Sequence, residues 1–302
     1  MSLRLLPPED PFEHIHADVR HLALADRATR KAAIFTDRWV DYPAGLTAIA
    51  RLFELFDMPR RTRMPSILFW ADSNGGKSFI QKEFIRRVER RQVGEQSPPH
   101  TVLRCEMNAD LNEKRLYMDL LAAMNVKGPE AATASRLQAM VLTHLEGRVV
   151  RVIMLEELQR AVELRPRDRR VVMDSLRYIS NKLAICMAGF GSHESKEVID
   201  ADDHLRTRFE VIELPRWSRR EKWTVDLVKG RIAYMPLRRP TNVDLAFMDM
   251  LDQYTEGSLG QAVYLLERCG AAALEKEECI TVEMIEAVAL GRRGGDDERQ
   301  VV

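Results

Sequence analysis

One short segment constrains the fold of this chain more than any other, the run ADSNGGKS at residues 71–78. It follows the short apolar run SILFW, typical of a buried strand, and precedes FIQKEFIRRVERR, which has helical spacing. Apart from Ala71 at the first glycine position, the run matches the pattern G-x-x-x-x-G-K-[ST] of a phosphate-binding loop. The pattern therefore predicts a strand, a loop and a helix that together hold the phosphates of ATP.

The chemistry of such a loop is specific. Its backbone N–H groups point at an anion, and the N-terminus of the following helix adds partial positive charge. Lys77 would neutralise the β and γ phosphates, and Ser78 would give an oxygen to Mg²⁺. Ala71 is small enough to keep the tight turn, and a plain glycine-rich turn is the alternative interpretation. The predicted cofactors are ATP and Mg²⁺, and the predicted nucleotide-binding residues of this segment are Ala71, Asp72, Ser73, Asn74, Gly75, Gly76, Lys77, Ser78 and Phe79.

Two adjacent acids follow the most apolar strand candidate, in VIMLEE. A P-loop enzyme needs one carboxylate for Mg²⁺ and another that polarises the attacking water. By position, Glu156 would face Mg²⁺ and Glu157 the water. Glu156 stands where an aspartate is expected, and its extra methylene shifts the metal contact or routes it through water. The alternative is a pair of solvated acids at the start of a helix.

The rest of the chain predicts one α/β domain followed by helices. Strand candidates occupy residues 66–70, 101–107, 149–155, 183–190 and 209–214. Helical patterns separate them, which favours a five-stranded parallel sheet covered on both faces. After Pro215, four helical patterns occupy residues 218–234, 243–255, 259–275 and 281–290, with no convincing strand between them. This change marks a second, all-helical domain.

Composition narrows the class of protein. Lys plus Arg and Asp plus Glu both number 46 in the 302 residues, so any nucleic-acid surface must be a local stripe. No apolar run reaches the ~20 residues of a membrane span, and the N-terminus lacks the apolar core of a signal peptide. The four cysteines form no CxxC pair, which argues against disulfides and zinc. We expect a soluble protein from a reducing compartment.

Four segments together resemble a known family: RWVDYP, RMPSILF, GGKS and RFEVIELPRW. In this order they look like the TniB/TnsC group of bacterial transposition ATPases, from about residue 14 to residue 289. The resemblance implies an AAA+ fold with a helical lid, and therefore four parts. They are an N-terminal arm and adenine-side segment over 1–44, the P-loop domain over 45–215, the lid over 216–290 and a disordered tail over 291–302.

The resemblance also implies an activity and partners. Such a protein oligomerises with ATP as a ring or filament on duplex DNA, without a sequence-specific helix-turn-helix. It recruits a transposase and often a TniQ-type adaptor, and hydrolysis of ATP disassembles or remodels the assembly. It acts in the bacterial cytoplasm with no membrane partner. The sequence leaves two alternatives open: a nucleotide-gated DNA-binding scaffold that barely hydrolyses ATP, and another DNA-handling AAA+ protein such as an initiator or helicase loader.

Further site residues are implied by the resemblance. Ser192 falls at the position that senses the γ-phosphate. Arg208 falls at the arginine finger that reaches a neighbour's ATP, with Arg206 as the alternative. Trp39 and Tyr42 fall near the adenine, although a role as core anchors is an equal interpretation. The lid offers Gln261 where many AAA+ proteins have an arginine, so either this sensor is absent or Arg268 serves instead.

Local positive charge gives the predicted DNA contacts. The first candidates are Lys114, Arg115, Arg136 and Arg148. A second basic run, LRPRDRR, follows the strand-end acids and carries Arg165, Arg167, Arg169 and Arg170. A solvated helix face is the alternative for any single one of these side chains.

Overall fold

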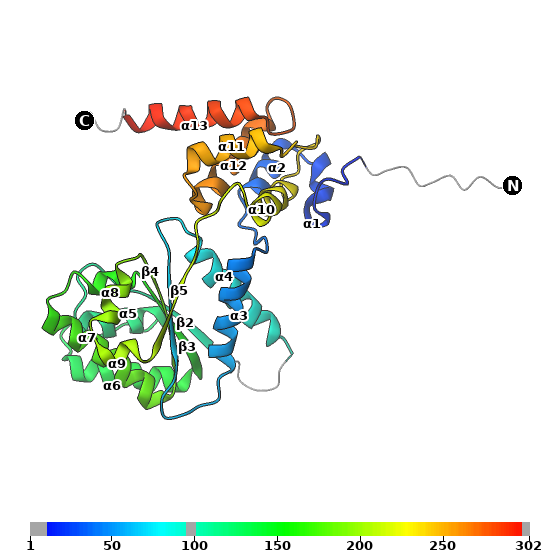
Figure 1. Cartoon of the computed structure of the whole chain (residues 1–302). Helices are drawn as coiled ribbons and strands as arrows, with labels where there is room; N and C mark the ends of the chain where they lie inside the picture. The colour runs from blue at the N-terminus through cyan, green and yellow to red at the C-terminus, as the bar shows by residue number, and fades with distance from the viewer. Residues whose placement is uncertain (1–10, 95–100, 298–302) are drawn as a thin grey trace. The chain divides into compact units, whose positions relative to one another are not determined.

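The structure is a computed structural model that describes residues 11–94 and 101–297. The chain divides into two compact units (Figure 1). Residues Ala44–Pro215 form one, called the P-loop unit below. The described residues up to Pro43, together with those from Arg216 onward, form the other, called the helical unit.

The P-loop unit is built on a five-stranded sheet, as the sequence predicts. Its strands are β1 (Ser66–Trp70), β2 (Thr101–Glu106), β3 (Val150–Glu156), β4 (Cys186–Gly191) and β5 (Phe209–Glu213). They lie in the order β2-β3-β4-β1-β5, and every neighbouring pair is parallel. β4 begins three residues later than predicted, because the preceding helix runs to Leu183 and ends on Ala184 in the left-handed region (φ 50°).

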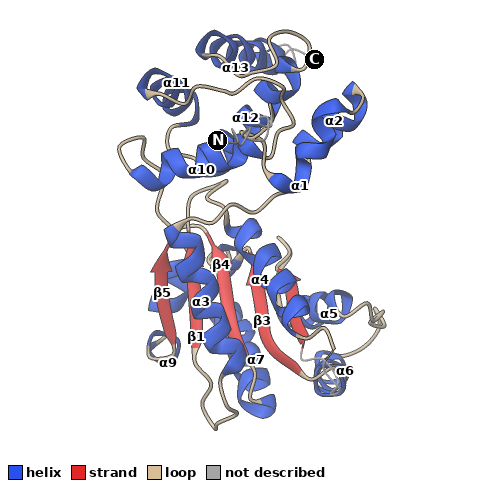
Figure 2. Cartoon of the chain, turned by 90° about the vertical axis from the view of Figure 1, so that its right-hand side faces the viewer, coloured by secondary structure: helices blue, strands red, loops and turns tan. Residues whose placement is uncertain are grey.

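Helices cover both faces of this sheet, because its strands are apolar on both sides. α3 (Pro43–Asp57) and α4 (Lys77–Arg91) lie on one face, with Phe53 of α3 packed edge-on against Phe84 of α4 (Figures 1 and 2). The other helices of the unit are α5 (Glu113–Ala123), α6 (Ala134–Gly147), η2 (Leu158–Ala161), α7 (Pro166–Leu183), α8 (Ser195–Asp200) and α9 (Asp203–Arg206). α5, α6 and α7 lie on the opposite face from α3 and α4 (Figure 1).

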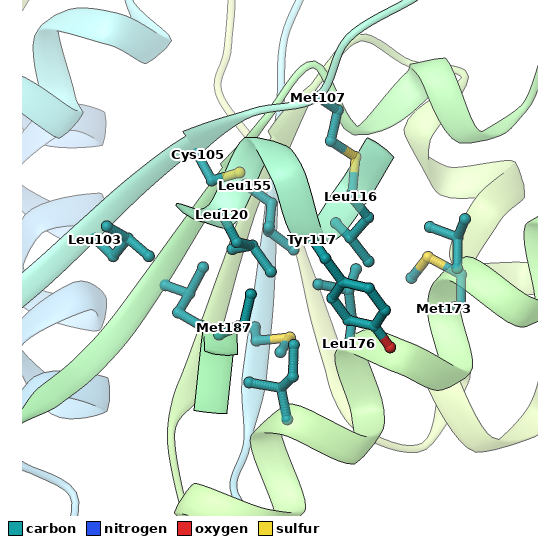
Figure 3. Packing of buried hydrophobic residues seen from close by; sticks show 14 of the residues in the cluster. Leu103, Cys105, Met107, Leu116, Tyr117, Leu120, Leu155, Met173, Leu176 and Met187 are labelled. Atoms are coloured by element: carbon teal, nitrogen blue, oxygen red, sulfur yellow. The ribbon is translucent and has the colours of Figure 1, made fainter. Parts of the chain in front are cut away.

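A continuous apolar core joins this second layer to the sheet. Tyr117 and Leu120 of α5 meet Leu155 of β3, Met187 of β4 and Leu176 of α7 (Figure 3). All five are at most 3% exposed. Burying one such side chain stabilises the fold by roughly 1.5–3 kcal/mol. The core therefore fixes the ends of β3 and β4, where the polar residues of the site begin.

Four helices make up most of the helical unit: α10 (Lys222–Ala233), α11 (Leu245–Thr255), α12 (Leu259–Ala273) and α13 (Val282–Asp297). Their core contains Phe247, Leu266, Cys269 and Ile285, each fully buried. α13 continues past residue 290 to Asp297, beyond the predicted end of the lid, and residues 298–302 of the expected disordered tail lie outside the described residues. No helix in the described ranges is both long and apolar enough to span a membrane.

The N-terminal segment differs from the predicted polar arm. α1 (Ala17–Arg20), η1 (His21–Leu24) and α2 (Arg27–Ile34) fold as part of the helical unit. Ile15, Val19 and Ala23 are buried against Tyr234, and the buried Arg30 donates to the carbonyl of Pro236 at 2.9 Å and pairs with Glu278. Apolar residues four apart, rather than the overall polarity, decide the outcome here. The predicted arm over residues 1–10 lies outside the described residues.

Candidate nucleotide-binding site

The loop after β1 has the backbone of an anion cradle. The Ala71 N–H still donates to the Gly191 carbonyl of β4 (3.1 Å), so the loop leaves the sheet only after Ala71. Gly75 N–H then closes a turn onto the Asp72 carbonyl (3.1 Å), and Asn74 (φ 59°) and Gly76 (φ 83°) take the left-handed conformation. Gly76 is the N-cap of α4. This turn aims the free N–H groups of the first helical residues at the loop centre.

The departure from the motif at Ala71 is compensated within the loop. A Cβ placed on Gly75 would lie 2.6 Å from the Ala71 Cβ and 3.0 Å from the Asp72 carbonyl oxygen. The methyl group of Ala71, itself 2% exposed, therefore occupies the space that the absent side chain of Gly75 leaves. The two small residues together keep the turn tight.

Lys77 lies inside the loop. Its Nζ donates to the carbonyl oxygens of Ala71 (2.8 Å) and Asp72 (2.9 Å). Burial lowers the pKa of its ammonium below the usual range, while the negative charges of Glu157 and Asp72 oppose that shift. The ammonium is thus held by neutral dipoles near the carboxylate of Glu157. Ser78, the next residue, is exposed.

Glu156, at the end of β3, is engaged in an ion pair. Arg104 of β2 donates from Nε (2.8 Å) and Nη2 (2.6 Å) to the same oxygen, Oε1, of Glu156. Arg104 also donates to the Oε1 atom of Gln81, one turn into α4 (3.2 Å). Arg104 therefore bridges the strand-end acid and the helix that follows the P-loop.

Glu157 takes a backbone conformation that is rare for its residue type, with φ 58° and ψ 39°. Its Oε2 accepts a hydrogen bond from Nε2 of Gln159 at 2.7 Å. The oxygen of the same Gln159 amide accepts from the Ser192 N–H at 3.1 Å. The Ser192 hydroxyl binds the carboxylate of Glu194, and this bond lowers the pKa of that exposed acid.

The predicted arginine finger lies at the other end of the sheet. The Ser66 N–H at the start of β1 donates to the Arg208 carbonyl (3.1 Å), whereas the P-loop follows the end of β1. Five residues of strand separate the two ends, roughly 16 Å. Arg208 therefore cannot reach the P-loop of its own chain.

The surroundings of Arg208 are positive. Burial, followed by the charges of Arg63 and Arg177, lowers the pKa of its guanidinium. Its Nη1 donates to Asn181 Oδ1 (2.8 Å), but its buried Nε has no hydrogen-bond partner within the described chain. The alternative, Arg206, is exposed and paired with Asp203 at 2.7 Å.

The four first candidates for DNA contact divide into two kinds, those whose side chains have a partner in the fold and one that has none among the described residues. Arg115 pairs with the buried Asp119 (2.8 Å), and Arg148 donates to the Met124 carbonyl at the end of α5 (2.9 Å). Lys114 donates to the Glu130 carbonyl. Arg136 is exposed, with no side-chain partner in residues 11–94 or 101–297.

The basic run after η2 divides in the same way. Arg169 donates to the carbonyls of Ala161 (3.0 Å) and Val162 (2.7 Å), which is a structural role. Arg167 and Arg170 are exposed near the start of α7, three positions apart and so neighbours on its surface. The exposed Arg165 has only a long contact to Asp168, at 3.8 Å.

Trp39 and Tyr42 belong to the helical unit. Their rings lie 5.5 Å apart, and Tyr42 stacks on Trp223 of α10 at 5.9 Å. Burial raises the pKa of the Tyr42 hydroxyl. Tyr42 is therefore buried beside α10 and not under the sheet, Trp39 is partly buried, and contact of either ring with adenine stays a prediction. In the lid, Gln261 lies in the first turn of α12, and Arg268 lies over the ring of Tyr264 at 6.0 Å.

Two contributors to this site, Arg104 and Gln159, are absent from the sequence-based list. Arg104 is a charged residue inside an apolar strand candidate, and Gln159 is the polar residue two positions after the strand-end acids. Both features can be recognised in the sequence, but neither shows which acidic side chain Arg104 or Gln159 contacts. That depends on β2 lying beside β3, and on β4 lying beside β3.

A parallel sheet in this order, with a P-loop after β1 and acids after β3, defines a P-loop nucleotide-binding fold of the AAA+ class. Similar solved structures agree. The Aeropyrum pernix ORC1 protein in complex with DNA aligns with a TM-score of 0.64 at 15% identity, covering 86% of this chain and 69% of that one. The A. pernix ORC2 protein in ADPNP–ADP complexes gives 0.58 at 13% identity, covering 86% and 71%. Drosophila ORC bound to DNA gives 0.60 at 13%, covering 95% and 68%.

At these identities the likeness shows the fold alone. No curated protein matches the chain in sequence. The model of the family described as bacterial TniB protein matches residues 30–219, which is well over half of the chain. The chain therefore belongs to the TniB family, as the resemblance of its motifs predicts.

Proposed function

We propose that this protein is an ATP-dependent, DNA-binding regulator of transposition. It oligomerises on target duplex DNA, recruits a transposase and a TniQ-type adaptor, and leaves the DNA when ATP is hydrolysed. The observation that carries the proposal is family membership combined with a P-loop lysine placed beside a strand-end acid. Lys77 in the P-loop and Glu157 lie close enough for their charges to interact.

The residues present fit ATP and Mg²⁺. Lys77 gives up two carbonyl contacts for phosphate oxygens, which are stronger acceptors because they are charged. Ser78 and Glu156 would hold Mg²⁺, which neutralises charge on the β and γ phosphates when bound. Glu157 would polarise the attacking water, and Ser192 would contact the γ-phosphate. Arg208, at the far end of the sheet with an unpartnered Nε, would complete the site of a neighbouring copy.

DNA contact is assigned to exposed cations whose side chains have no hydrogen-bond or ion-pair partner among the described residues. Arg136, Arg167 and Arg170 carry it in this proposal, because their charges can neutralise phosphates. Lys114, Arg115 and Arg148 also hold the fold, so replacing them would weaken binding partly through stability. Largely sequence-independent binding follows from backbone contacts of this kind.

A scaffold that binds but barely hydrolyses ATP is the second candidate. The observation that favours it is the ion pair between Arg104 and Glu156, which occupies the predicted metal ligand. Both candidates predict ATP-dependent assembly on DNA, and they differ in turnover. An initiator or helicase loader would assemble in the same way, but it would not stimulate strand transfer by the cognate transposase.

The assembly test compares the two arginines of the predicted finger. Full-length chain is mixed with duplex DNA and ATP, ADP or no nucleotide, and assemblies are counted by electron microscopy. On duplex DNA, we expect rings or filaments with ATP but not with ADP or without nucleotide. Arg208→Ala should abolish them and Arg206→Ala should leave them, because, of these two arginines, it is Arg208 that has a buried donor without a partner among the described residues. A protein that stays monomeric with ATP and DNA would contradict the proposal.

A further inference from the structure

Gln159 lies between two parts of the site that are far apart in sequence, the strand-end acid Glu157 and the segment around Ser192. It is the second residue of η2, the short helix that follows β3, and its neighbour Leu158 is fully buried. A Cβ on Gly189 of β4 would lie 2.8 Å from Leu158 Cδ2, so η2 packs closely on β4. Gln159 is therefore held between the ends of β3 and β4.

The orientation of its carboxamide is fixed by a donor that cannot be reversed. The backbone N–H of Ser192 can only donate, and it lies 3.1 Å from Oε1 of Gln159. The hydroxyl of the fully buried Ser195 donates to the same oxygen at 3.4 Å. The NH₂ group must then face the other way, toward Glu157, where it donates to Oε2 at 2.7 Å.

The surrounding backbone is shaped to this amide. A Cβ on Gly191 would lie 2.6 Å from the Gln159 Oε1 and 1.9 Å from the Ser195 Oγ. Only glycine at position 191 leaves room for the side chain. On the other side, Glu157 has a left-handed backbone, a conformation that persists only where neighbours hold it.

We propose that Gln159 is a positioning residue for ATP hydrolysis, acting through Glu157. Its NH₂ group holds one carboxylate oxygen of Glu157 and leaves the other for the attacking water. Its oxygen ties this arrangement to the Ser192 backbone, at the predicted γ-phosphate sensor. A shift of the Ser192 loop on phosphate binding would move the amide and hence the carboxylate. The inference rests on the proposed function, because it concerns the hydrolysis assigned to the same site.

The first test replaces Gln159 by methionine, which keeps the length of the side chain and removes its hydrogen bonds to Glu157, Ser192 and Ser195. The full chain is assayed with ATP, Mg²⁺ and duplex DNA. We expect kcat to fall roughly tenfold to a hundredfold, with KM for ATP and the affinity for a fluorescent ATP analogue changed less than about twofold. In a Glu157→Gln background, the same substitution should cause little further loss, because Gln159 acts through that carboxylate.

A matched control removes another carboxamide of the same unit. Gln138 of α6 donates to the Tyr117 hydroxyl at 2.6 Å, outside the site. Gln138→Met tests a purely structural loss and should leave kcat unchanged. Thermal unfolding of both variants shows whether they fold.

The second test uses charge. In Gln159→Glu the introduced carboxylate can still accept from the Ser192 N–H, but it meets the Glu157 carboxylate instead of donating to it. Like charges at this distance raise the pKa of the pair. The rate of this variant relative to wild type should therefore rise as the pH falls and a shared proton restores the donor. A merely structural role would not move the pH profile.

The outcomes separate the inference from the proposed function. A wild-type chain that binds ATP and DNA without turnover overturns the hydrolytic function and the inference together. Wild-type turnover that Gln159→Met retains overturns the inference alone. So does a Gln159→Glu variant that is folded and has the pH profile of wild type.

Discussion

Two charged side chains of the nucleotide site are held in opposite ways. Lys77 rests on the neutral carbonyl oxygens of Ala71 and Asp72. Glu156 rests on a full positive charge, that of Arg104. Lys77 would bind the phosphates and Glu156 the metal ion. Lys77 would give up only two neutral carbonyl partners for phosphate oxygens, whereas Glu156 would have to break an ion pair with Arg104, which costs more free energy.

The free energy of the Arg104–Glu156 ion pair decides how strongly it opposes metal binding. The side chain of Arg104 is 36% exposed and that of Glu156 is 17% exposed, so solvent screens the pair. Such ion pairs contribute about 1 kcal/mol or less. This is enough to weaken metal binding about fivefold, but not enough to prevent it. The site should bind nucleotide readily and hydrolyse it slowly.

Of the changes that test this comparison of Lys77 with Glu156, disrupting the tight turn of the P-loop should have the largest effect, a loss of ATP affinity. Gly75→Ala places a Cβ against Ala71 and opens the cradle of Lys77. We expect ATP affinity to fall roughly a hundredfold, measured with a fluorescent analogue (about 2.8 kcal/mol of binding energy). The double variant Ala71→Gly/Gly75→Ala restores the space and should regain part of the affinity. Unchanged binding by Gly75→Ala would refute the compensation between the two residues.

Releasing Glu156 should have an intermediate effect. Arg104→Met removes the competing charge, so the Mg²⁺ concentration for half-maximal turnover should fall about fivefold. Arg86→Met, which breaks the ion pair with Glu83 on α4, is the control and should leave that concentration unchanged. If Arg104→Met instead needs more Mg²⁺, Arg104 supports the metal site rather than competing with it.

The pH dependence of binding should give the smallest effect. Burial lowers the pKa of Lys77 below its ordinary 10.5, and only the protonated form attracts phosphate. ATP affinity should therefore weaken a few-fold as the pH rises toward 10.5, because the lowered pKa lies below that value. Lys77→Met, with weak binding and no ammonium, should lack this slope. A flat wild-type profile up to that pH would contradict the lowered pKa.

Sequence patterns predicted the local structure around a motif, where all the residues involved lie close together in the chain. The strand, loop and helix around Lys77 follow from local spacing, and the five-stranded parallel sheet follows from the alternation of apolar strands with helices. The strand order does not follow, since it depends on contacts between distant segments. The ion pair of Arg104 with Glu156 and the bridge from Gln159 to Ser192 could not be predicted for the same reason.

The N-terminal segment shows a second limit. Its first 30 residues are polar and include three prolines, which predicted an arm. However, α1 and α2 belong to the helical unit and bury Ile34 and Arg30 there. A buried arginine is unfavourable without partners, and those partners, Pro236 and Glu278, lie more than 200 residues away in sequence. No local sequence pattern predicts such distant partners.

In the proposed function, this site is an ATP-hydrolysing switch whose base is Glu157. Steady-state ATP hydrolysis by the full chain, with and without duplex DNA, tests this beside Lys77→Ala and Glu157→Gln. We expect turnover that DNA stimulates and that both variants lose, with Glu157→Gln still binding ATP. Binding of ATP and DNA without turnover, or a Glu157→Gln variant as fast as wild type, would contradict it.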